Sequence, residues 1–257
     1  MSQERLQEAD GLLSAINLAQ PTMEGAAVFR AVGEWHAVQG RWKLAADRLS
    51  LLLKVNQLEA LDMATMDYLR CGPALIETGG LAGYEQFRQE AIARFSAAPC
   101  PFADRIVKIS LLMPANASLL ESLNPLAVAT AEGLAAADAG GDNFTAAWRA
   151  LAMGLLEYRR GNYANALKWS QRCVASPEVN GPRTAAARLV SAMAWFQLGR
   201  SGEAQTDLAA ARELIEDKAR TPFDRGSPIQ GFWFDWAFAR ILQREATALV
   251  AGPAANE

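Results

Sequence analysis

The stretch LAMGLLEYRRGNYANALKWSQRCVA, residues 151–175, contains two apolar segments on either side of Gly161. Apolar side chains recur in both segments at the spacing of an α-helix. Glycine permits the left-handed backbone at which a helix ends, so Gly161 predicts a turn between two helices. Gly154 and Ala166 are small, and they allow the two helices to approach closely. The stretch therefore predicts a helical hairpin.

The same arrangement of an apolar helix, a glycine and a second apolar helix occurs at other places in the chain. Residues 31–55 turn at Gly40, and residues 189–215 turn at Gly199. In each of these three hairpins an alanine follows the turn glycine by five residues: Ala45, Ala166 and Ala204. A weaker copy, residues 71–95, has Gly79 at its turn, and Pro73 is expected to kink or tighten its first helix.

This pattern resembles the tetratricopeptide repeat (TPR), a helix–turn–helix unit that stacks into a right-handed α-solenoid. Residues 147–180 match best, with Gly154, Tyr163, Ala166 and Pro177 in consensus places. The repeats here are longer than the consensus, and the excess lies in connections such as SPEVNGPR, residues 176–183. The resemblance implies an all-α solenoid of about twelve helices without strands.

The order of the segments is also similar to the C-terminal TPR region of bacterial serine/threonine protein kinases of the planctomycete and verrucomicrobial type. There, a helix rich in aromatic residues closes the array, and FWFDWAFARILQREATALV, residues 232–250, matches it here. A solenoid needs such a helix to cover the apolar face of its last repeat. The resemblance implies an accessory module of a bacterial signalling system. The chain itself has no G-x-G-x-x-G, H-R-D or D-F-G motif of a kinase.

These patterns predict one domain over residues 1–257. Its expected parts are an N-terminal helix (1–20), five helical hairpins (24–58, 60–97, 101–138, 143–177 and 182–217) and a capping helix (229–250).

Composition excludes several classes of function. Apolar residues make up 51% of the chain, which is enough for a large core, and the formal net charge is −3. No block of lysine and arginine suggests nucleic-acid binding, and no apolar run is long enough to cross a membrane. Three cysteines without a C-x-x-C pair fit a reducing compartment, so we expect a cytoplasmic protein.

No motif predicts catalysis, a metal or a cofactor. His36 is the only histidine, so sites with several histidines are excluded. It lies beside Trp35 within a predicted helix, where a packed or surface histidine is expected. The segment DAGGDNFTAAWR, residues 138–149, lacks the glycine and the final glutamate of a calcium loop. We therefore expect a non-catalytic protein.

The first helix of each TPR lines the concave groove, and the matching positions here predict a partner-binding surface. Its residues are Arg30, Met66, Leu69, Trp148, Leu155, Tyr158, Arg159, Met193, Phe196 and Arg200. An apolar and aromatic lining favours an apolar or amphipathic segment of a partner protein. Arg30 is the only cation at the positions that TPR domains use to hold acidic chain ends, so such ends are not expected to bind. A sensor of small ligands or peptides on the same scaffold, and an enzyme of unrecognised class, remain the alternatives.

Overall fold

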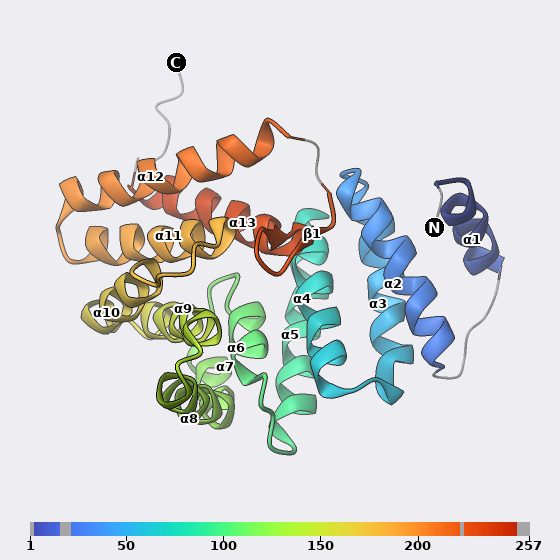
Figure 1. Ribbon diagram of the computed structural model, residues 1–257, viewed down its shortest axis with the longest axis horizontal. Coiled ribbons are helices and arrows are strands. Elements are labelled where there is room, and N and C mark those ends of the chain that lie inside the picture. Colours follow the sequence, from blue (N-terminus) through green and yellow to red (C-terminus); the bar gives the residue numbers. More distant parts are fainter. Residues whose placement is uncertain (1–2, 16–21, 222–223, 251–257) are drawn as a thin grey trace.

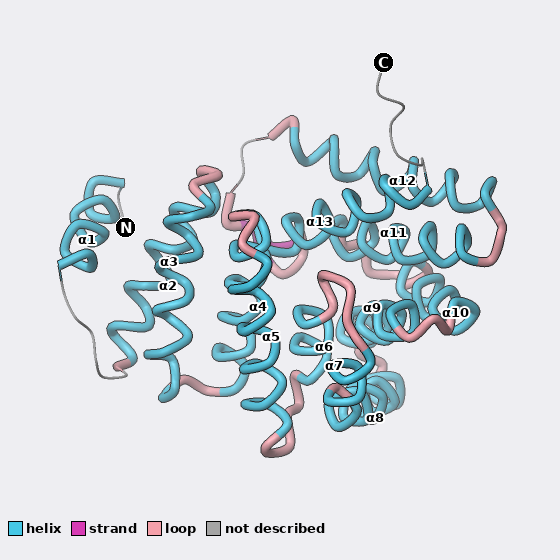
Figure 2. Tube along the Cα trace, turned by 180° about the vertical axis from the view of Figure 1, so that it is seen from behind, coloured by secondary structure: helices cyan, strands magenta, loops and turns pink. Residues whose placement is uncertain are grey.

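The computed structural model describes residues 3–15, 22–221 and 224–250, and most of them are helical (Figures 1 and 2). The all-α prediction is confirmed. The described residues form α1 (Gln3–Ala15), α2 (Met23–Val38), α3 (Trp42–Val55), α4 (Leu61–Glu77), α5 (Leu81–Ser96), α6 (Ala103–Ser110), α7 (Ala117–Ser122), α8 (Asn124–Gly140), α9 (Asn143–Arg159), α10 (Tyr163–Val174), α11 (Gly181–Gln197), α12 (Ser201–Ala219) and α13 (Trp233–Val250). A 3₁₀ turn, Asn56–Leu58, follows α3.

The turn glycines lie where the sequence predicts them. Gly40, Gly79, Gly161 and Gly199 have φ angles of 70°, 78°, 79° and 73°, in the left-handed region that glycine adopts without strain. They join α2 to α3, α4 to α5, α9 to α10 and α11 to α12. Each of these pairs is in contact, so the four predicted turns produce four helical hairpins.

Small residues bring the helices of a hairpin together, as predicted. A Cβ added at Gly33 of α2 would lie 2.7 Å from side-chain atoms of Leu49 on α3. A Cβ at Gly154 of α9 would lie 2.7 Å from Oγ of Ser170 on α10. Real Cβ atoms do not approach other atoms so closely, so both glycines are required by the packing. Ala45, Ala166 and Ala204 are fully buried on the opposite helices.

The structure differs from the sequence-based expectation in two places. Residues 101–138 hold three helices, α6, α7 and most of α8, where one hairpin was expected. Two short antiparallel strands, β1 (Gly226–Ser227) and β2 (Gly231–Phe232), precede α13, although no strand was expected. The chain turns back at this hairpin, and so directs α13 toward the inside of the molecule.

Helix α13 packs on α11 and α12 and also contacts α4 (Figure 1). Its first residues carry aromatic rings that are almost completely buried: Trp233, Phe234, Trp236 and Phe238. The Trp233 ring lies 6.3 Å from that of Trp42 on α3, and Arg244 forms a 2.9 Å ion pair with Glu77 on α4. Helix α13 therefore touches both early and late helices of the chain.

Helix α1 docks on α2 and α3 through a partly buried cluster of charged and polar side chains. Oδ1 of Asp10 lies 2.6 Å from Nε of Arg48 on α3, and Oδ2 lies 3.1 Å from Nε2 of His36 on α2. Burial raises the pKa of Asp10, but the hydrogen bond from Arg48 and the nearby charges outweigh burial and hold that pKa below its usual value. The predicted N-terminal helix, 1–20, extends beyond Ala15 into residues 16–20, which lie outside the described part of the chain.

Candidate functional site

The predicted groove residues do not form one open surface. Leu155 and Met193 are fully buried, and Leu69 is 5% exposed. Six of them are partly buried: Arg30, Met66, Trp148, Tyr158, Arg159 and Phe196. Arg200, the residue before α12, is exposed and pairs with Glu203 in the first turn of that helix. Much of the predicted groove lining is therefore covered by the protein itself.

Helix α13 covers the part of the predicted groove lining around Arg159. The guanidinium of Arg159 pairs with both carboxylate oxygens of Glu245 on α13, and it also donates to the backbone oxygens of Leu111 and Leu112. Only 4% of the Arg159 side chain is exposed. Burial raises the pKa of Tyr158, the preceding residue, to about 12. Both side chains therefore lie near Glu245 of α13 and do not line an open groove.

Three of the predicted residues, Met66, Leu69 and Trp148, come together in a pocket of about 670 Å³. Its walls are built from α4, α6, the end of α8, the start of α9 and the β-hairpin with the start of α13. A pocket of this size is within the range of small-molecule binding sites. The aromatic side chains that complete its lining are Phe102, Phe144, Phe232 and Phe234. Helices distant in sequence thus create one concave, mainly apolar site.

Lys108 of α6 supplies a charge to this pocket that the sequence analysis missed. The side chain belongs to the lining, is only 3% exposed, and places Nζ 3.8 Å from the centre of the Trp148 ring. Such a position is a cation–π contact, which is stronger where water is excluded. Burial lowers the pKa of Lys108, because the charged ammonium loses its hydration.

The other cations of the lining are paired. Arg105 lies 2.6 Å from Asp62, and Arg149 lies 3.9 Å from Asp104. Arg70 lies 2.7 Å from Glu34 on α2. Among the described residues, no carboxylate lies within 4.0 Å of Nζ of Lys108. Lys108 is therefore the one lining cation without an ion pair in the part of the chain that the structure describes.

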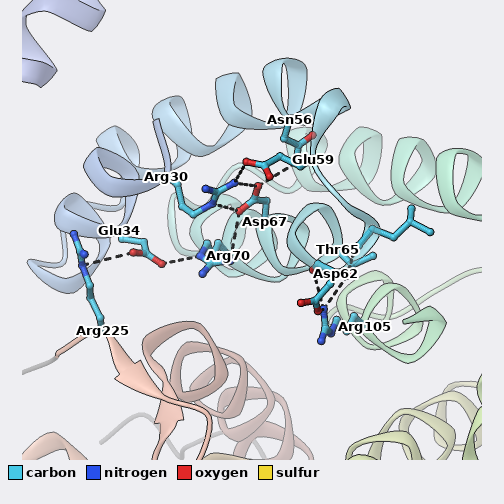
Figure 3. Close-up of polar contacts among 11 residues, drawn as sticks. Arg30, Glu34, Asn56, Glu59, Asp62, Thr65, Asp67, Arg70, Arg105 and Arg225 are labelled. Carbon is cyan, nitrogen blue, oxygen red and sulfur yellow. Dashed lines mark hydrogen bonds and ion pairs between the residues drawn. The ribbon is translucent and has the colours of Figure 1, made fainter. Parts of the chain in front are cut away.

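An ion-pair network on α2 and α4 fixes the wall that carries Met66 and Leu69 (Figure 3). Asp67 is fully buried, and its carboxylate accepts hydrogen bonds from Arg30 at 2.7 and 2.8 Å and from Asn56 at 3.2 Å. Figure 3 also shows Glu34 between Arg70 and Arg225, which precedes the β-hairpin. The network thus ties α4 to α2 and to the segment leading into α13.

Asp235 contributes a second buried ionisable group to the pocket lining. Its carboxylate accepts the backbone N–H of Phe232 at 3.0 Å and so caps the first turn of α13. Burial raises the pKa of Asp235, which is 8% exposed, and the charge of Lys108 opposes that shift. The capping contact gives Asp235 a structural role at the pocket wall.

The residue types that most often bind metal ions are not clustered in the described part of the chain. His36 lies outside the pocket, against Trp35 and Asp10. Cys71, Cys100 and Cys173 are buried and unlinked. No group of three or more His, Cys, Asp or Glu side chains in the described ranges is placed to hold a metal ion. None of the described helices combines the length and hydropathy needed to cross a bilayer.

Comparison with known proteins gives no family. No protein-family model matches the chain, and no curated protein matches it. The function is therefore argued from the pocket and from the helices that build it.

Proposed function

We propose that this protein is a non-catalytic binding module on a TPR-like, right-handed α-solenoid, and that it holds a short apolar or amphipathic segment of a partner protein. Contacts between consecutive helices support the solenoid, because α2 to α5 and α8 to α12 each pack on the next helix in sequence. The buried aromatic residues of α13 support its role as the closing helix.

The pocket is the observation that carries the proposal. It gathers Met66, Leu69 and Trp148 from α4 and α9, the helices that would line a TPR groove. A methionine adapts to different shapes, and a tryptophan is a frequent anchor of binding energy. Since α13 covers the inner face beyond the pocket, the partner segment is a short one that ends or turns at the pocket.

The wider setting is proposed from the resemblance to bacterial serine/threonine kinases: a cytoplasmic module that brings a partner to a signalling system. The unlinked cysteines support a reducing compartment. The alternative, a small-ligand sensor on the same scaffold, is favoured by one observation: the pocket encloses a lysine without an ion pair among the described residues.

A random-peptide library panned against the purified protein tests the proposal. The Trp148→Ala substitution should weaken the binding free energy of the selected peptides by about 2 kcal/mol or more, which is the usual scale for an anchor residue. Phe196→Ala is the matched control, because Phe196 lies on α11 outside the pocket lining. Peptides that lose affinity on Phe196→Ala but keep it on Trp148→Ala would assign the binding surface to α11 and contradict the proposal.

A further inference from the structure

Lys108 lies in an environment that disfavours its charge, and the carboxylates of Asp104 and Asp235 act on it only from beyond 4.0 Å. The side chain is 3% exposed, its Nζ lies over the Trp148 ring, and no carboxylate of a described residue lies within 4.0 Å. Burying an unpaired ammonium is costly, and proteins usually pair or neutralise such a group. An ammonium at the wall of a pocket can be paired by the negative charge of a ligand that binds there.

We propose that the pocket binds a small apolar carboxylic acid. Its carboxylate would pair with Nζ of Lys108, and its hydrocarbon part would pack on Met66, Leu69 and Trp148. The three lining arginines each have a carboxylate within 4.0 Å, so Lys108 supplies the positive charge that a ligand can neutralise. A charge-assisted hydrogen bond in a pocket shielded from water is stronger than one at the surface.

The surrounding groups favour a monoanion over other charged ligands. Asp62, Asp104 and Asp142 also line the pocket. Lys108 can neutralise one negative charge of a ligand, and these carboxylates would repel the further charges of a phosphate ester or of an acidic peptide. An ammonium ligand would be repelled by Lys108 itself. The aromatic and aliphatic lining favours a hydrocarbon body, and the volume of about 670 Å³ is sufficient for a small molecule.

This site goes beyond the proposed binding of a partner segment, although the two would share one pocket. A small acid needs no protein partner, and its binding is measured on the purified protein alone. The peptide library can therefore yield no binding peptide although the acid binds, and the acid can show no binding although peptides bind. The two proposals are thus tested separately.

The experiment compares 3-phenylpropionate with its neutral analogue, 3-phenylpropanamide. Both are titrated into ¹⁵N-labelled protein, and the indole N–H peak of Trp148, assigned with Trp148→Phe, is followed by NMR. We expect a saturable shift with the acid and about tenfold or more weaker binding of the amide. Lys108→Met, which keeps the length of the side chain without its charge, should remove this preference for the acid and leave the affinity for the amide unchanged.

Lys168→Met is the matched control. Lys168 also lies over a tryptophan, Trp169 at 5.4 Å, but it is exposed and outside the pocket. This variant should bind both compounds like the wild type. The amide titration also shows whether the pocket of Lys108→Met is still formed. Equal affinities of the wild type for acid and amide, no saturable shift with the acid, or a preference for the acid that survives Lys108→Met would each overturn the proposal.

Discussion

Lys108 carries a charge that folding removes from water, so the free energy of unfolding depends on this residue. We expect Lys108→Met to stabilise the protein, because the thioether side chain fills similar space without an ammonium to desolvate. In a chain of this size each kcal/mol gained raises the melting midpoint by about 2–4 °C. Thermal unfolding at neutral pH measures the change, with Lys168→Met as the control. A lower midpoint for Lys108→Met would mean that the ammonium stabilises the fold.

The pH dependence of stability gives a second test of Lys108. Burial lowers its pKa below the ordinary value of 10.5. Between the lowered pKa and 10.5, the unfolded chain binds a proton that the folded chain does not bind. The free energy of unfolding therefore rises with pH in this window, and the rise ends at about 10.5.

Denaturant titrations from pH 7 to pH 10.5 should show this rise in the wild type and a smaller one in Lys108→Met. The difference between the two proteins isolates Lys108 from the other titrating side chains. The charged and titratable groups around it are Asp104 and Arg105 on α6, Arg70 on α4, Arg149 on α9, Cys173 on α10 and Asp235 on α13. Burial raises the pKa of Cys173 to about 12, so its thiol stays protonated in this window. Equal slopes in the two proteins would contradict the prediction.

Besides its aromatic residues, helix α13 is held by ion pairs, and the pair of Glu245 with Arg159 is more buried than that of Arg244 with Glu77. Glu245 neutralises Arg159, whose side chain is 4% exposed. Glu245→Gln would leave the guanidinium without its carboxylate partner in this buried position, at a cost of about 1–3 kcal/mol. Chemical denaturation measures the loss, and Glu213→Gln on the exposed face of α12 is the control. A loss no larger than that of the control would show that the backbone oxygens of Leu111 and Leu112 are sufficient partners for Arg159.

The aromatic residues of α13 should contribute more than this ion pair. Trp236 is 7% exposed, and its ring fills the space that a side chain at Gly181 would need. Trp236→Ala would leave a cavity, and deleting a buried tryptophan side chain costs about 3–5 kcal/mol. Leu198→Ala, at a residue 44% exposed after α11, provides the comparison. A midpoint for Trp236→Ala close to that of the comparison would mean that the indole is exposed in solution.

Across the whole molecule, the hairpins could be predicted from the sequence and the pocket could not. A turn depends on one glycine and on the helical spacing beside it, and both are local properties of the sequence. The pocket depends on where α13 lies, because Phe234 and Asp235 approach Met66 and Lys108 only after the chain folds back. Lys108 was missed because α6 has no repeat signature, and groove positions were assigned only within recognised repeats.

The predicted groove positions assumed that the inner face is open. Leu155 on α9 and Met193 on α11 are fully buried, and α13 packs on α11. Nothing in the TPR pattern indicates that the closing helix also reaches α4. The aromatic cluster of residues 232–238 indicated burial, but it could not indicate the helices that it packs against.

This double contact of α13 predicts that distant parts of the chain are stabilised together. A helix that only covers the last hairpin would support α11 and α12, and the early helices would be unaffected by its loss. Here Trp233 is fully buried, contacts Trp42 of α3, and precedes Phe234, whose ring centre lies 5.3 Å from the guanidinium of Arg70 on α4. Trp233→Ala should therefore loosen α4 and α11 at once, although they are far apart in sequence.

Hydrogen exchange measured by mass spectrometry reports this coupling, because exchange rates follow the free energy of local opening. We expect exchange to become about tenfold faster in both α4 and α11 of Trp233→Ala, equivalent to about 1.4 kcal/mol of lost local stability. Ile229→Ala in the preceding hairpin, at a residue 78% exposed, should leave both helices unchanged. Faster exchange confined to α11 and α12 would mean that α13 stabilises only the last hairpin. Faster exchange in α4 as well would mean that α13 joins α4 to α11 and α12 and stabilises the wall of the pocket that α4 forms.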